Sequence, residues 1–185
     1  YLLDYAFQCH ARSGGLFDIT SGILRKAWGN FSEGHLPSKD SIAPLLAKVG
    51  MDKLRWRRPT LAFPVPGMEL DLGGIGKEYA ADRAAEVLTA TGIRHGLVDL
   101  GGDINVIGPH ADNGDPWQIG IRHPRESGSL LGNVEISRGA IASSGDYERC
   151  MIIDGVRYCH ILDPRTGWPV RGLASVSVVA DRCIE

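Results

Sequence analysis

A glycine-broken stretch from Met68 to Ala85, MELDLGGIGKEYAADRAA, constrains this chain more than any other part of its sequence. It begins with a short alternating pattern, breaks at Gly73, Gly74 and Gly76, and continues with the spacing of a helix. The pattern predicts a strand, a glycine turn and the start of a helix. Backbone N–H groups at such a helix start attract an anion, so the stretch indicates a phosphate-bearing ligand.

The spacing of this glycine turn matches neither of the two common phosphate-binding patterns. GGIGKEYA is not the GxGxxG of a dinucleotide fold, nor the GxxxxGK[ST] of a P-loop. A turn that merely reverses the chain explains the glycines about equally well. Asp71 before the turn and Lys77 after it favour a ligand site, because a carboxylate accepts from a ribose or a ring N–H and an ammonium group offers a point charge to a phosphate.

Length and charge limit the classes of protein to consider. The 185 residues suffice for one ordinary domain with a sizeable core, so we expect a single domain over residues 1–185. A net charge of −2 gives no excess of positive charge to attract nucleic acid, so we expect no nucleic-acid partner. The chain starts within a helical pattern at Tyr1 and stops straight after an apolar strand, so we expect truncation at both ends.

The four cysteines do not have the spacing of a metal finger. No CxxC pair occurs among Cys9, Cys150, Cys159 and Cys183, which argues against zinc binding. A turn at Asp154-Gly155 lies midway between Cys150 and Cys159 and places them opposite each other across a hairpin. A pair of buried free thiols is an equally good interpretation.

Periodicity along the rest of the chain predicts helices separated from a run of strands. Helices are expected over 1–11, ending at Ser13-Gly14-Gly15, and over 41–49, ending at Gly50, with a short helix between them capped by Thr20 or Ser21. The helix of the glycine motif is expected to stop at Gly92. Strands and hairpins follow, which favours an α+β fold with a mostly antiparallel sheet and packed helices. Two glycine-broken strand-helix units hint at an ancient internal duplication.

Three aspartates admit a structural interpretation beside a functional one. Asp18 precedes the short helix, where a cap or turn role is the simpler interpretation. Asp99 and Asp103 flank the Gly101-Gly102 break, and on that stretch alone they are expected to bond the tight turn.

Taken together, the motifs resemble those of a known family. SGGLFDITSG, LDLGGIGKEYAADRA, LVDLGGDI, PWQIGI, AIASSGDYER and HILDPRTGWPV occur in the order and at the intervals of the ApbE family, the FAD:protein FMN transferases. The resemblance covers nearly the whole chain. It implies cleavage of the pyrophosphate of FAD, transfer of FMN to a threonine hydroxyl of a target flavoprotein, and release of AMP, with Mg²⁺ as the usual metal. A carrier module that holds FAD without transfer and an FAD pyrophosphatase that gives FMN and AMP are the alternatives.

The resemblance also assigns roles to individual residues. It implies His160 as the base that takes the proton of the attacking hydroxyl, a role that suits an imidazole near neutral pH. For an isolated histidine, a bond to the Asp163 turn is the simpler interpretation. The magnesium contact falls on the backbone carbonyl of Gly74, an oxygen donor that this ion accepts. The implied flavin contacts are Leu16, Phe17, Asp18, Asp71, Lys77 and the backbone of Leu162.

The chain departs from the family pattern in two respects. The principal magnesium carboxylates of the family come from an acidic segment of the type ADALAT, which is expected beyond Glu185. Glu78 stands where most members have glycine and adds a negative charge beside Lys77.

The resemblance implies a membrane redox complex as the source of the acceptor subunit. It also implies a place in the periplasm or on the outer face of the bacterial inner membrane, with a lipid anchor outside this chain as the only membrane attachment.

Overall fold

The computed structural model describes residues 1–29, 31 and 34–185, and the chain divides into two compact units. The first unit comprises residues 1–72 and 146–172, and the second comprises residues 73–145 and 173–185. The expected single domain over residues 1–185 stays a prediction.

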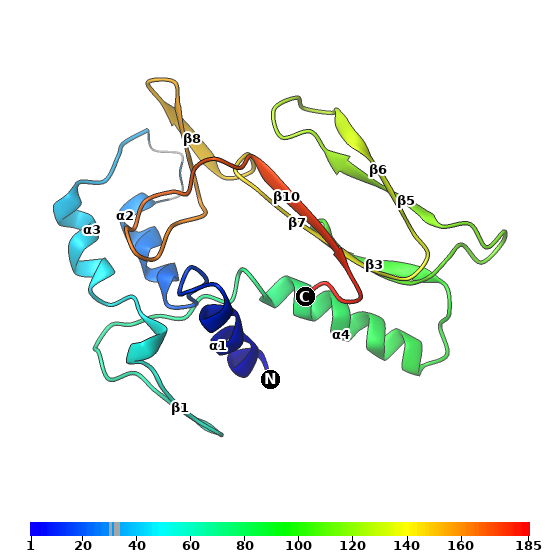
Figure 1. The fold of residues 1–185 in the computed structure, drawn as a ribbon, viewed down its shortest axis with the longest axis horizontal. Coiled ribbons are helices and arrows are strands. Elements are labelled where there is room, and N and C mark those ends of the chain that lie inside the picture. Colours follow the sequence, from blue (N-terminus) through cyan, green and yellow to red (C-terminus); the bar gives the residue numbers. More distant parts are fainter. Residues whose placement is uncertain (30, 32–33) are drawn as a thin grey trace. The chain divides into compact units, whose positions relative to one another are not determined.

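Short helices occupy the N-terminal part of the first unit (Figure 1). They are α1 (Leu2–Arg12), η1 (Ser21–Leu24), α2 (Arg25–Trp28), α3 (Lys39–Leu46) and η2 (Met51–Lys53). As expected, α1 ends at the double glycine: Gly15 has a φ of +84° and its N–H bonds the carbonyl of His10 at 2.9 Å. This positive φ is easily reached only by glycine. Helix α3 is capped by Ser38, whose side chain accepts from the N–H of Ser41 at 3.1 Å.

Two details of these helices differ from the expectations. Neither Thr20 nor Ser21 caps the short helix with its side chain. The hydroxyl of Ser21 donates instead to the carbonyl of Asp18 at 2.7 Å. Gly50 does not end α3, which finishes at Leu46. Gly50 precedes η2 with a φ of +142°.

Two hairpins complete the first unit. Strand β1 (Arg55–Arg57) pairs with β2 (Thr60–Ala62), and β8 (Cys150–Ile153) pairs with β9 (Val156–Cys159). The predicted turn at Asp154-Gly155 is confirmed, with φ values of +50° and +76° at its two residues. Positive φ at both central residues is the signature of the tight two-residue turn whose twist matches that of the strands.

The core of the first unit joins its early helices to the β8–β9 hairpin. The indole N–H of Trp28 donates to the carbonyl of Gly167 at 2.8 Å, across 139 residues of sequence. Leu162 and Trp168 pack against the same cluster. The buried members of this cluster are Ile23, Leu24, Trp28, Phe31, Ile42, Val49, Met151 and Tyr158.

The second unit has a helix on one face of a four-stranded antiparallel sheet (Figure 1). The helix is α4 (Gly76–Ala90), followed by Gly92 at a φ of +99°, as expected. The sheet has the order β10 (Ser175–Ala180), β7 (Gly139–Gly145), β4 (Asp103–Gly108) and β3 (Gly96–Leu100). Helix α4 packs on β3 and β4, through a cluster that contains Ala81, Val98 and Ala140.

The opposite face of this sheet packs against a separate hairpin of β5 (Trp117–Arg122) and β6 (Leu130–Ile136). Because side chains alternate along a strand, Val106 and Ile141 face this hairpin while Asn105 and Ala140 face α4. The buried residues on the hairpin side are Val106, Ile119, Ile136 and Ile141.

Asp82 ties the end of the chain to α4. Its buried carboxylate accepts from the side-chain amide of Asn105 and the backbone N–H of Cys183, both at 2.8 Å, and from the N–H of Ile184 at 3.2 Å. These bonds satisfy a carboxylate that would otherwise be costly to bury. They hold residues 183–184, which follow β10, against the helix.

The α+β fold with antiparallel sheet is confirmed, but one element of the central motif is not. Residues 68–72 form no strand. The N–H of Asp71 bonds the carbonyl of Ile19 at 2.7 Å, a contact with a loop and not with a sheet. The break at Gly101-Gly102 joins two strands, β3 and β4, and so does not repeat the turn that precedes α4. In the described part of the chain, every helix is too short or too polar to cross a bilayer.

Candidate functional site

The loop that follows α1 carries three of the expected flavin contacts in a row. Leu16 is 50% exposed, and Phe17 is half-buried. The loop is anchored at Phe17, whose N–H bonds the hydroxyl of Ser13 at 2.9 Å and whose carbonyl bonds Nδ1 of His10 at 2.8 Å. Leu16 therefore presents an apolar side chain on a loop whose backbone is held in place.

Asp18 is buried directly behind this loop, and its carboxylate is already bonded. Oδ1 accepts from the N–H of Thr20 at 2.8 Å and from its hydroxyl at 2.5 Å, and Oδ2 accepts from the N–H of Met51 at 3.0 Å. This is the turn role that the sequence made the simpler interpretation. A flavin contact of Asp18 stays a prediction.

Asp71 lies beside this loop, because its N–H bonds the carbonyl of Ile19 at 2.7 Å. Oδ2 accepts from Nη1 of Arg25 at 2.6 Å. Gly22 lies so close beneath that a Cβ added there would overlap the side chain of Asp71. The structure thus brings Asp71 to Ile19, which directly follows residues 16–18 and is more than fifty positions away in sequence.

Arg25 is a residue of this site that the sequence did not single out. Its guanidinium, on the first turn of α2, pairs with the carboxylate of Asp71 and is itself 55% exposed. The neighbouring Lys26 pairs with Glu69 in the same way. In the sequence, two adjacent basic residues and two acids in the stretch MELD are only weak evidence for ion pairs. The fold shows that these residues meet.

His160 follows the end of β9, at the base of the β8–β9 hairpin. The backbone N–H of His160 donates to the carbonyl of Arg149 at 3.0 Å, and the ring atom Nδ1 lies 3.3 Å from the same oxygen. Burial lowers the pKa of His160 below its ordinary value, the nearby Arg149 charge lowers it further, and the bond to the Arg149 carbonyl opposes both. The imidazole is therefore neutral near pH 7.

The two residues expected near His160 behave differently. The Asp163 turn does not bond His160: its carboxylate accepts from Nη2 of Arg165 at 2.8 Å, and this pairing lowers the pKa of Asp163. Leu162 forms an isolated bridge with Pro169 and packs against the core that contains Leu24 and Trp28. The backbone of Leu162 is thus held by the same core as the helix that follows residues 16–18.

In the second unit, the turn of the glycine motif leads directly into α4. Ile75 is the residue before the helix and provides no side-chain cap. The ammonium group of Lys77 pairs with Asp103, whose side chain is 2% exposed, at the start of β4. Because a buried carboxylate needs a positive partner, this ion pair orients the lysine from the sheet side. Asp99, in contrast, bonds the N–H of Gly102 at 2.8 Å, which confirms its expected role in the turn.

Glu78 has one carboxylate oxygen, Oε2, that is buried without a hydrogen-bond partner. Burial is the main reason that its pKa is raised, and the negative charges of Asp103 and Asp82 raise it further. The charged form of Glu78 is therefore costly where this side chain lies.

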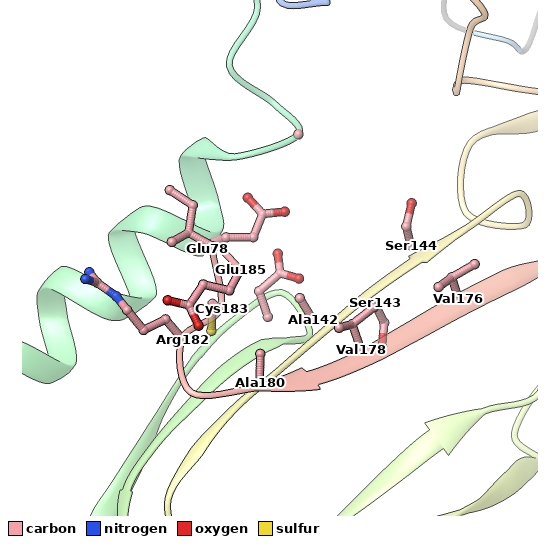
Figure 2. A pocket seen from close by; sticks show the side chains of 13 residues that line it. Glu78, Ala142, Ser143, Ser144, Val176, Val178, Ala180, Arg182, Cys183 and Glu185 are labelled. Atoms are coloured by element: carbon pink, nitrogen blue, oxygen red, sulfur yellow. The ribbon is translucent and has the colours of Figure 1, made fainter. Parts of the chain in front are cut away.

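A pocket lies on the face of the sheet that α4 covers, beyond the N-terminal end of the helix. Glu78, Arg182 and Glu185 gather on one side of it, and Val176 and Val178 project into it from β10 (Figure 2). The two valines are about half exposed. Its lining also includes Gly74, Asp103, Ala142, Ser143, Ser144, Ala180, Cys183 and Ile184.

The donor set for a metal in this pocket is incomplete. Within the described residues, no group of three or more His, Cys, Asp or Glu side chains is arranged to hold an ion. The carboxylate of Asp103 is already paired with Lys77. The described residues therefore do not by themselves form a magnesium site, and the contact expected at Gly74 stays a prediction.

The expected site residues divide between the two units. Leu16, Phe17, Asp18, Asp71, His160 and Leu162 belong to the first unit, whereas Gly74 and Lys77 belong to the second. Within the first unit, Asp71 bonds Ile19, the residue that directly follows residues 16–18. The common cleft for Asp71, Lys77 and His160 stays a prediction.

The sequence of the chain is similar to those of several known proteins. The chain is 39% identical over 185 residues to an FAD:protein FMN transferase of Rhodobacter capsulatus, covering 97% of this chain and 35% of the relative. It is 33% identical over 193 residues to the enzyme of that name from Escherichia coli K12, covering 100% of this chain and 55% of the relative. The chain therefore spans about a third to a half of these relatives.

The fold has solved counterparts as well. The ApbE protein of Thermotoga maritima matches with a TM-score of 0.88 at 36% identity, covering 99% of this chain and 60% of the relative. A sequence model of the ApbE family matches residues 1–185 in full. By both its sequence and its fold, the chain belongs to the ApbE family.

Proposed function

We propose that this chain is the flavin-binding part of an FAD:protein FMN transferase. The observation that carries the proposal is the match of residues 1–185 to the ApbE family, together with relatives of that name at 33–39% identity. In the proposed reaction, a threonine hydroxyl of an acceptor protein attacks the FMN phosphorus of FAD. The phosphoanhydride bond breaks, and AMP leaves.

The first unit supplies the groups proposed to hold the isoalloxazine ring. Leu16 and Phe17 offer apolar surface to the ring, on a loop whose backbone is held at Phe17 through both its N–H and its carbonyl. Asp71 offers a carboxylate to a ring or ribose donor, and Arg25 holds that carboxylate in one orientation. A preoriented acceptor binds more tightly because less conformational freedom is lost on binding.

Lys77 and the uncapped start of α4 are proposed to receive the diphosphate. The backbone N–H groups of the first turn and the lysine charge both favour an anion. The ion pair with Asp103 holds the ammonium group in place before FAD arrives. Phosphoryl transfer depends mainly on positioning and charge neutralisation, which are the contributions these groups make.

His160 is proposed to take the proton of the attacking hydroxyl. A general base must be unprotonated at the working pH, and the lowered pKa of His160 meets this condition near neutrality. The contacts of Nδ1 and the backbone N–H with the Arg149 carbonyl orient the ring. In the proposed step, the imidazole gains the hydroxyl proton as the threonine oxygen bonds to phosphorus.

Magnesium is proposed as the metal of the complete protein, where it would neutralise charge on the diphosphate. The described residues do not fit such an ion on their own. The proposed acceptor is a subunit of a membrane redox complex. We also propose that the complete protein acts in the periplasm or on the outer face of the inner membrane. Both proposals are supported by the family resemblance alone.

The test uses the full-length protein with FAD, Mg²⁺ and a peptide that contains the acceptor threonine. We expect a covalent FMN adduct of the peptide by mass spectrometry, with one AMP released per adduct. AMP and FMN without an adduct would replace the proposal with FAD hydrolysis. Bound FAD with neither product would replace it with a carrier function.

Two variants assign the roles within this reaction. His160→Ala is expected to keep FAD binding and to lose transfer, whereas Lys77→Ala is expected to weaken FAD binding. His95→Ala is the matched control, since His95 is exposed and its Nδ1 lies 3.0 Å from the carbonyl oxygen of Pro109. Unchanged transfer in His160→Ala would remove His160 from the mechanism.

A further inference from the structure

The base of the β8–β9 hairpin places two cysteines directly opposite each other. Cys150 on β8 is the register partner of Cys159 on β9. The next pair outward, Arg149 and His160, is joined by a backbone hydrogen bond of 3.0 Å. Because hydrogen-bonded and non-hydrogen-bonded pairs alternate along antiparallel strands, Cys150 and Cys159 form a non-hydrogen-bonded pair.

This class of pair has the spacing that a disulfide needs. The Cα atoms of a non-hydrogen-bonded pair are about 4.5 Å apart, and their side chains lie on the same face. Disulfides join Cα atoms about 4.4–6.8 Å apart. Both cysteines are free thiols here, so the backbone already supports a bond that side-chain rotation would complete.

The two thiols differ in a way that sets the order of reaction. Cys159 is buried, with 2% of its surface exposed, and its Sγ contacts the carbonyls of Ile161 at 3.7 Å and Val170 at 3.8 Å. Burial raises the pKa of the Cys159 thiol. Cys150 is partly exposed, and Nη1 of Arg157 donates to its Sγ at 2.8 Å. A positive group at a partly exposed sulfur is typical of a cysteine that reacts first.

We propose that Cys150 and Cys159 form a reversible disulfide across the base of this hairpin, with Cys150 as the thiol that external oxidants reach. The oxidant is a disulfide, either a small molecule or a protein. Cys150, as thiolate, attacks one sulfur of that disulfide, forms a mixed disulfide and releases one external thiolate. Cys159 then loses its proton to solvent, attacks Sγ of Cys150 and releases the second. The external disulfide thereby accepts two electrons and two protons and becomes two thiols.

The bond would form beside the residue proposed as the base. Cys159 directly precedes His160, and Cys150 directly follows Arg149, whose carbonyl holds the His160 ring and N–H. A disulfide at this pair would restrict the strands that carry both residues. This consequence for catalysis rests on the proposed function, whereas formation of the disulfide does not.

The first test is a peptide map of the full-length protein after equilibration with oxidised glutathione. Arg157 lies between the two cysteines, so trypsin separates them unless the sulfurs are joined. We expect a linked pair of peptides, residues 150–157 and 158–165, that lacks two hydrogen atoms and disappears on reduction. A stable glutathione adduct on Cys150 with Cys159 still open to alkylation after denaturation would overturn the proposal. A link from either residue to Cys9 would also overturn it.

Four variants sharpen this result. Cys150→Ser and Cys159→Ser should each abolish the linked peptides, and Cys9→Ser should leave them unchanged. Arg157→Gln should slow the reaction of Cys150 with oxidised glutathione severalfold while circular dichroism stays unchanged. An equal rate would remove Arg157 from the proposal. Because all these readouts are masses and thiol reaction rates, they stand even if the protein transfers no flavin.

Discussion

The carboxylate of Asp18 receives two hydrogen bonds from a single residue, Thr20, one from its backbone N–H and one from its hydroxyl. The distances are 2.8 Å and 2.5 Å, and both residues are buried. The hydroxyl of Thr20 in turn accepts from the N–H of Gly50 at 2.7 Å. Asp18 therefore links the loop of residues 16–18 to the start of η2.

Replacing this carboxylate should destabilise the first unit. Asp18→Asn places an amide N–H₂ where an acceptor is needed, so one buried donor loses its partner, at a cost of about 1–3 kcal/mol. Urea denaturation measures this loss. Asp52→Asn, at an exposed acid close by, should change stability by less than about 0.5 kcal/mol. Equal midpoints for the two variants would contradict the structural role of Asp18.

The Arg25–Asp71 pair should affect flavin binding more than it affects folding. Both partners are partly exposed, so Arg25→Gln should cost no more than about 1 kcal/mol of stability. It should raise the Kd for FAD, measured by flavin fluorescence, because Asp71 loses the group that orients it. Lys26→Gln is the matched control, since Lys26 is the next residue on α2 and pairs with Glu69. If both variants bind FAD equally well, Arg25 does not position Asp71.

His160 should titrate below its ordinary pKa of 6.5 in the folded protein, because burial disfavours the charged ring. The unfolded chain then binds this proton more readily than the folded one. The stability contributed by neutral His160 is therefore complete above pH 6.5 and is lost as the pH falls from 6.5 through the folded pKa. NMR titration of the ring measures this midpoint, with His160→Asn to assign the signal. The acid limb of kcat/KM should share that midpoint, and a value at or above 6.5 would count against the assignment.

Glu78 should make the folded protein less stable at neutral pH. Its pKa is raised from 4.5, mainly by burial, so the folded state binds the proton more tightly than the unfolded state does. The stability linked to this group is complete below pH 4.5 and is lost as the pH rises through the folded pKa. Glu78→Gln should therefore raise the thermal midpoint at pH 7 and have little effect near pH 4.

A control on the same helix separates this effect from a general loss of charge. Glu86 is exposed and accepts from Arg182 at 2.9 Å, so Glu86→Gln should lower the midpoint slightly or leave it unchanged at pH 7. The prediction would be refuted if Glu78→Gln raised the thermal midpoint over that of the parent by no more at pH 7 than at pH 4.

Local sequence patterns predicted the features that depend on neighbouring residues. Gly15 and Gly92 mark helix ends, and Asp154-Gly155 and Gly101-Gly102 mark hairpins, because positive φ is inexpensive only at glycine and a few polar residues. The order of the motifs also predicted the family. The strand expected over residues 68–72 does not form. Alternating apolar and polar residues form a strand only where another strand pairs with them. Here Asp71 bonds the carbonyl of Ile19 in a loop instead.

By itself, then, the sequence determined the family, the fold class and the turns, all of which follow from residue type and close spacing. Only the tertiary structure decided which charges meet. Arg25 pairs with Asp71 across 46 residues and Lys77 with Asp103 across 26, while Glu78 is left with a buried oxygen that has no partner. Such pairings depend on how distant segments pack, because electrostatic and hydrogen-bond energies are set by separation in space and by burial.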